Sequence, residues 1–249
     1  MANSGRSPFQ SPSSETETPM SHFPIDRRLL LGGLALAGAA AAPAQTAAPA
    51  LVGAFAPKPL PFDPKAVLGL SEKLLLSHHD NNYAGAVKRL GAIRGDIGKL
   101  DWATAPGYQI NGLKREELIA WNSMILHEVY FAGLAPGAAV GAPLAAAIER
   151  DFGSHERWAA EFAGMGKALG GGSGWVILVL SRHDGRLVNS WAADHTMTLA
   201  DGAPLLVLDM YEHAYQMDYG AKAGAYVNAF MKAFSWGHAN EAYDRAGAA

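Results

Sequence analysis

The 249-residue chain contains no cysteine. Disulfides, thiolate metal sites and cysteine nucleophiles are therefore excluded, and any metal site has to be built from histidine, aspartate and glutamate. Charge is also scarce, since 17% of the residues are charged and the formal net charge is −3. A nucleic-acid-binding protein usually carries a basic excess, so this balance argues against such a partner. With 49% hydrophobic residues, the composition is that of an ordinary globular protein with one or two small domains.

The N-terminal stretch lacks the apolar periodicity of folded structure. Residues 1–19 are rich in Ser, Thr and Pro, a composition typical of disorder, and translation can start at Met1 or at Met20. Arg27 and Arg28 precede a short run of Gly, Ala and Leu that ends in small residues, which is the order of regions in an export signal. The arginine pair resembles a twin-arginine signal. We therefore expect a periplasmic protein without a membrane anchor after processing, because the apolar run is too short to span a bilayer comfortably.

The pattern of apolar residues after this leader predicts an α+β fold. We expect residues 1–60 to form the leader, export signal and linker, residues 61–135 an N-terminal domain of two antiparallel helices, and residues 140–246 an α/β domain. Helical spacing and N-cap residues place the helices, and apolar runs bounded by turn residues place three strands of an antiparallel sheet. The predicted helices cover residues 68–90, 114–131, 144–152, 154–169, 221–234 and 238–243, with a connection at 96–112, and the predicted strands cover residues 175–180, 186–192 and 205–208.

A possible metal site lies where the third predicted strand ends. The apolar run 205–208 is followed by Asp209, and His213 comes four residues later. A carboxylate at a strand end and an imidazole on the next turn can converge on one point, and both are suitable ligands for a first-row transition metal. An Asp-x-x-x-His pair on a polar helix face is the simpler interpretation of these two residues alone.

The stretch 209–215, Asp-Met-Tyr-Glu-His-Ala-Tyr, resembles the Asp-x-Trp-Glu-His-Ala-Tyr signature of the iron/manganese superoxide dismutases, with Tyr211 in place of the tryptophan. The resemblance extends from about Leu70 to Tyr243. It implies an enzyme that converts superoxide to oxygen and hydrogen peroxide at a single iron or manganese ion. Zinc cannot serve, because it has no second accessible oxidation state. The alternative is a catalytically weak metal-binding homologue with a structural or interaction role.

The resemblance implies three further ligand positions besides Asp209. His213 and His127 match the family pattern directly, whereas the first helix offers two neighbouring histidines. Ungapped placement puts His78 at the ligand position. A register with a three-residue deletion instead uses His79 and brings Tyr83 to the family's gateway tyrosine. We favour His78, because a deletion inside a helix rotates every later residue to another face.

The resemblance also implies residues that act around the metal. His195 lies between the second and third strands, where the family has a Gln or His that hydrogen-bonds the metal-bound solvent. Ser123, at the alternative position for such a glutamine, is too short for this task. Trp175, in a Gly-Ser-Gly-Trp stretch, corresponds to a tryptophan that helps wall the active site, and Tyr130 is assigned to the catalytic site as well.

Departures from the family pattern cluster in the first helix. In the ungapped register Asn82 replaces a histidine, and Ala86 replaces the gateway tyrosine. The family histidine commonly meets a tyrosine of the other subunit, and the corresponding residue here is Gln216. We expect a homodimer in which Asn82 and Gln216 can form an amide pair and Glu212 bonds the partner's ligand histidine.

Overall fold

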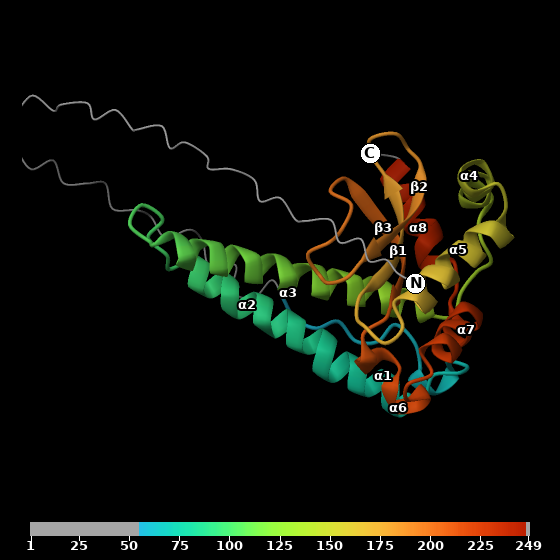
Figure 1. The fold of residues 1–249 in the computed structure, drawn as a ribbon, viewed down its shortest axis with the longest axis horizontal. Coiled ribbons are helices and arrows are strands. Elements are labelled where there is room, and N and C mark those ends of the chain that lie inside the picture. Colours follow the sequence, from blue (N-terminus) through green and yellow to red (C-terminus); the bar gives the residue numbers. More distant parts are fainter. Residues whose placement is uncertain (1–54, 248–249) are drawn as a thin grey trace, which may run out of the picture. The chain divides into compact units, whose positions relative to one another are not determined.

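The computed structural model describes residues 55–247, so the predicted leader and export signal lie outside the described residues. Figure 1 shows two long helical segments that run side by side, next to a small sheet with further helices. The sheet has three antiparallel strands, which confirms the predicted α+β class. In the part of the chain that the structure describes, none of the helices combines the length and the apolar character needed to cross a membrane.

The first long helical segment changes its winding in the middle. Ser71 caps it, and its hydroxyl accepts the Leu74 N–H at 3.1 Å. Because a π-helix bonds residue i to i+5, the buried face passes from His78 to Tyr83 in five residues rather than four. The predicted helix over 68–90 therefore exists in modified form and continues further. A short 3₁₀ turn, η1 (Pro64–Ala66), precedes this helical segment. The segment itself consists of α1 (Glu72–Ser77), the π-helical η2 (His78–Tyr83) and α2 (Ala84–Ile97).

The second long helix, α3 (Gly107–Leu134), begins earlier than the sequence pattern suggested. The predicted start at Lys114 and the predicted connection over 96–112 are wrong, since only residues 98–106 separate α2 from α3. Pro106 occupies the N-cap position. Gly112 inside the helix costs about 1 kcal/mol relative to alanine, and the packing of α3 along α2 offsets that cost.

The sheet brings the end of one strand next to the start of another. β1 lies in the centre, so the strand order is β2-β1-β3, and the antiparallel register pairs Trp175 with both Ala192 and Asp209. Gly174, just before β1, has φ +139°, and a Cβ there would lie 2.2 Å from the Ala192 carbonyl oxygen. Only glycine fits this approach. The strands are β1 (Trp175–Ser181), β2 (Leu187–Ala192) and β3 (Gly202–Asp209).

The remaining helices cover the sheet and close the chain. α4, α5, α7 and α8 were predicted with small shifts of their ends, whereas η3 and α6 were not predicted. α5 packs on β1 and β2, whereas α3 and α8 pack on β3. The contact between α3 and β3 brings a residue of the long helix α3 close to the end of the sheet. These elements are α4 (Ala142–Phe152), α5 (His155–Ala168), the 3₁₀ turn η3 (Glu212–Ala214), α6 (Gln216–Tyr219), α7 (Ala223–Ala233) and α8 (Gly237–Gly247).

Candidate metal centre

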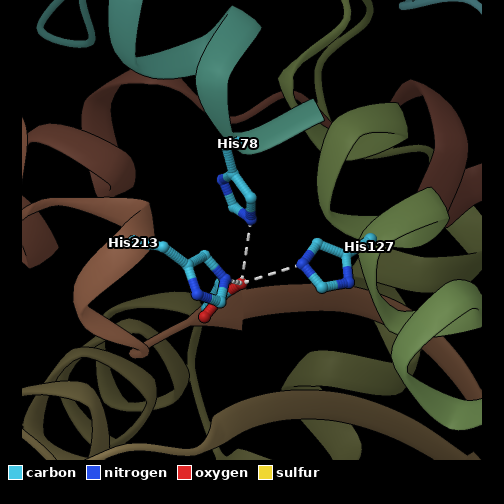
Figure 2. A group of neighbouring side chains, drawn as sticks. His78, His127 and His213 are labelled. Carbon is cyan, nitrogen blue, oxygen red and sulfur yellow. Dashed lines mark hydrogen bonds and ion pairs between the residues drawn. The ribbon is translucent and has the colours of Figure 1, made fainter. Parts of the chain in front are cut away.

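Four side chains from four separate elements converge in the interior (Figure 2). His78 comes from η2, His127 from α3, Asp209 from the end of β3 and His213 from η3, and one possible ligand atom of each lies within 4.8 Å of the others. Asp209 Oδ2 is 3.1 Å from His78 Nε2, 3.2 Å from His213 Nε2 and 3.6 Å from His127 Nε2. His213 is partly exposed and the other three are buried. The structure thus brings together the four residues proposed as ligands.

Backbone bonds hold Asp209 in the orientation that the cluster needs. Its Oδ1 accepts the Tyr211 N–H at 2.8 Å, and its carbonyl oxygen accepts the Tyr226 hydroxyl at 2.8 Å. Oδ2 is therefore left to face the three imidazoles. The sequence contained no signal for Tyr226, because it lies 17 residues away on α7 and its role depends on tertiary contact alone.

The tautomer of His127 follows from its partners. Its Nδ1 lies 2.6 Å from the carbonyl oxygen of Ser123, which only accepts, so Nδ1 carries the proton. Nε2 is then a free lone pair. This buried nitrogen has no hydrogen-bond partner among the described residues, although buried polar atoms are nearly always paired. A buried nitrogen lone pair that faces a carboxylate oxygen and two more imidazoles fits a metal cation.

Burial sets the protonation of the cluster. Desolvation lowers the pKa of His127 to about 3 and also lowers that of His78, where Asp209 opposes it only in part. Burial alone would raise the pKa of Asp209, but His213 and His78 hold it below its ordinary value. His78 and His127 are therefore neutral and Asp209 is ionised at neutral pH, as metal ligands must be. Nitrogen and oxygen ligands of this kind suit iron or manganese.

The neighbouring histidine is engaged elsewhere. His79 Nε2 lies 2.8 Å from the Lys58 carbonyl oxygen, and its Nδ1 lies 2.7 Å from Asp80 Oδ1. The structure thus places His78 and not His79 in the cluster. Tyr83 donates its hydroxyl hydrogen to Glu128 Oε1 at 3.0 Å and accepts the Lys58 N–H at 2.9 Å.

Trp175 and Tyr211 connect His195 to the cluster. The Trp175 Nε1–H donates to His195 Nδ1 at 3.0 Å, and the Trp175 ring lies edge-on to His127 with centroids 5.2 Å apart. The Tyr211 ring stacks between His195, at 4.9 Å, and His213, at 5.4 Å. Because tryptophan only donates, Nδ1 of His195 accepts and its proton is on Nε2. Sequence reasoning located His195 but missed that Trp175 fixes its tautomer.

Of the other residues assigned from sequence, Tyr130 packs against the cluster, and Asn82 lines a cavity together with His195. The Tyr130 ring lies 5.0 Å from the His78 ring, and burial raises the pKa of its phenol well above the ordinary value. Asn82 is partly buried and lines a cavity together with His195, Ala86 and Ser123.

Comparison with known proteins identifies the class that this fold and cluster define. Residues 140–242 match the model of the C-terminal domain of iron/manganese superoxide dismutases. A superoxide dismutase [Fe] of Cupriavidus metallidurans is 65% identical over 179 residues, covering 72% of this chain and 91% of the relative. A superoxide dismutase [Fe] of Aquifex aeolicus is 33% identical (74% and 88% covered), and a superoxide dismutase [Mn] of Halobacterium salinarum is 31% identical (76% and 94% covered). The chain belongs to the iron/manganese superoxide dismutase family.

Proposed function

We propose that this protein is a superoxide dismutase that holds one iron ion between His78, His127, Asp209 and His213. The buried Nε2 lone pair of His127, without a partner among the described residues, is the observation that carries the proposal. The choice of iron is supported by the relative that shares 65% identity and is named as an iron enzyme. When bound, iron supplies the two oxidation states with which one superoxide is oxidised to oxygen and the next is reduced to peroxide.

The chain's own residues prepare this centre. Ser123 fixes the ring of His127 through its carbonyl oxygen, and the Tyr211 N–H fixes the carboxylate of Asp209. Such orienting bonds keep ligand basicity and geometry constant, and their loss typically costs about 10–100-fold in affinity or activity. The aromatic rings of Trp175 and Tyr130 exclude bulk water from two sides of the cluster.

His195 is the group that we assign to solvent and proton handling. Formation of hydrogen peroxide requires two protons, which a positioned donor can relay. His195 accepts from Trp175 at Nδ1, so its Nε2–H remains available for donation. Burial lowers the pKa of His195, which keeps the imidazole neutral and the Nε2 proton as its single donor.

Replacement of His127 by alanine tests the metal assignment. We expect the purified variant to lose stoichiometric iron and superoxide-scavenging activity, because one of four ligands and a buried imidazole are removed together. His79→Ala is the matched control, since it removes the adjacent histidine outside the cluster and should keep its iron. Full iron occupancy and activity in His127→Ala would contradict the assignment, and loss of iron in His79→Ala alone would restore the rejected register.

Two further features belong to the proposal. The exposed side chains of Glu212 and Gln216 lie on the segment that follows Asp209, and we propose that they join two copies into a homodimer with adjacent metal centres. Arg27 and Arg28 support export to the periplasm through a twin-arginine route, in which the protein crosses the membrane folded and loaded with metal.

A further inference from the structure

The loop that carries His195 has no regular secondary structure. It spans residues 193–201 between β2 and β3, and residues 197–200 in it are exposed, whereas His195 is half-buried. Loops are in general more mobile than the strands they connect, because no ladder of backbone hydrogen bonds holds them. The direction of the His195 ring therefore depends on the contacts that this loop makes with other elements.

A side chain of the long helix α3 binds the backbone of this loop. The Asn122 Nδ2–H donates to the carbonyl oxygen of His195 at 2.6 Å, a contact between residues 73 positions apart. The next residue of the helix, Ser123, accepts the Nδ1–H of the ligand His127 at its own carbonyl oxygen. One turn of α3 thus holds both a metal ligand and the loop that carries His195.

The turn around His195 transmits the hold on its backbone to its ring. The Asp194 carboxylate accepts the Thr196 N–H at 2.7 Å and the Thr196 hydroxyl at 2.6 Å. A side chain that bonds the backbone two residues further on closes a tight turn. Because the residues on both sides of His195 are bonded to each other, a shift of its carbonyl group also shifts its ring.

Two aromatic side chains hold the ring of His195 itself. The Trp175 Nε1–H donates to Nδ1 at 3.0 Å, and the Tyr211 ring lies against the flat face at 4.9 Å, with 11° between the ring planes. The Tyr211 N–H is in turn bonded to the ligand Asp209. The backbone, one edge and one face of His195 are thus held from α3, β1 and the segment after β3, and Nε2–H is left free to donate.

We propose that Asn122 is a positioning residue for dismutation, which together with Tyr211 holds His195 in the orientation in which Nδ1 accepts from Trp175 and Nε2–H is free. The proposal rests on the proposed function, because donation from His195 serves dismutation there. The orientation of His195 itself does not depend on iron or on activity, so it can be measured in the metal-free protein.

Replacement of Asn122 by leucine removes the donor and keeps the volume and the charge. The chain should fold and retain its iron, because a carbonyl group on a partly exposed loop can bond to water instead. We expect the dismutation rate to fall about tenfold, as for other residues that orient groups around a metal, and the reduction potential of the iron to shift. Asn111→Leu is the matched control, since Asn111 is exposed on the same helix.

Nitrogen-15 NMR of the His195 ring in the metal-free protein measures the orientation directly. The unmodified protein and Asn111→Leu should show Nε2–H alone, because Trp175 occupies Nδ1. Asn122→Leu should show a mixture of the two tautomers, since the displaced ring loses that bond. If Asn122→Leu does not fold, Asn122→Asp decides by the same measurement, because a carboxylate of the same shape cannot donate to the carbonyl oxygen.

The His195→Ala background separates positioning from a general structural role. If Asn122 acts through His195, Asn122→Leu should change neither the rate nor the reduction potential any further in that background. Equal effects of Asn122→Leu with and without His195, or an unchanged tautomer and potential in the single variant, would overturn the proposal. A change of tautomer in an iron-loaded protein that never shows dismutase activity would refute the proposed function and leave the hold of Asn122 on His195 intact.

Discussion

Acidification should destabilise the metal-free protein at a pH where most proteins are stable. The ordinary histidine pKa is 6.5, and burial lowers the pKa of His127 to about 3. Between these pH values the unfolded chain binds a proton at His127 and the folded chain does not. The free energy of unfolding is unaffected by this residue above pH 6.5 and decreases as the pH falls below it.

The size of this effect follows from the pKa difference. One pKa unit corresponds to 1.36 kcal/mol, so His127 alone should remove about 2 kcal/mol of stability at pH 5 and about 4 kcal/mol by pH 3, where the folded state also begins to bind the proton. His78 acts in the same direction, because burial lowers its pKa as well. Asp209 has its pKa held below the ordinary value by His213 and His78, against the effect of burial. Its stabilising contribution is therefore lost only below about pH 4.

Urea unfolding of the metal-free protein at several pH values between 7.5 and 5, followed by tryptophan fluorescence, measures this dependence. Replacement of His127 by glutamine should make the dependence shallower by about 2 kcal/mol over this range. The same change at His183, an exposed histidine between β1 and β2, is the matched control and should leave the dependence as it is. Equal stability of the unmodified protein at pH 7.5 and 5 would refute the reasoning.

Three other predictions follow from the centre and its surroundings. His195→Ala should retain iron but lose about 10–100-fold in dismutation rate, and His195→Gln should lose less because an amide can still donate; an unchanged rate in the alanine variant, measured by pulse radiolysis, would remove His195 from the reaction. Replacement of Arg27 and Arg28 by lysine should trap precursor inside the cell, and undiminished periplasmic protein would exclude the twin-arginine route. Glu212→Gln should weaken the proposed dimer in sedimentation velocity, whereas unchanged association would show that this carboxylate takes no part.

The sheet was predictable because each strand is an apolar run between turn residues. The predicted and observed bounds differ most for the third strand, which starts at Gly202 and not at Leu205. Pro204 is an unfavourable residue inside a strand, because proline cannot donate to a neighbouring strand. β3 lies at the edge of the sheet, however, and the register shifts between Leu178 and Val179 opposite Pro204. An edge position and an irregular register are the two settings in which a strand tolerates proline.

The site was predictable only in part. Asp209 and His213 are close in sequence, so their convergence follows from local geometry. His127 carries no local signal, and its place among the ligands came from resemblance to a family. The support of Asp209 by Tyr226 arises from a contact between distant elements, which no spacing rule can encode.

The choice between His78 and His79 shows where local reasoning ends. Adjacent helical residues point about 100° apart, and a regular helix that keeps Tyr83 buried would also bury the residue four positions earlier, which is His79. The π turn of η2 adds one residue between the two buried positions, so that His78 and Tyr83 face the interior together. His79 is then free to bond the carbonyl oxygen of Lys58, 21 residues earlier. The ligand is therefore selected by a change of helix winding and by a distant backbone contact, and not by the spacing of the histidines.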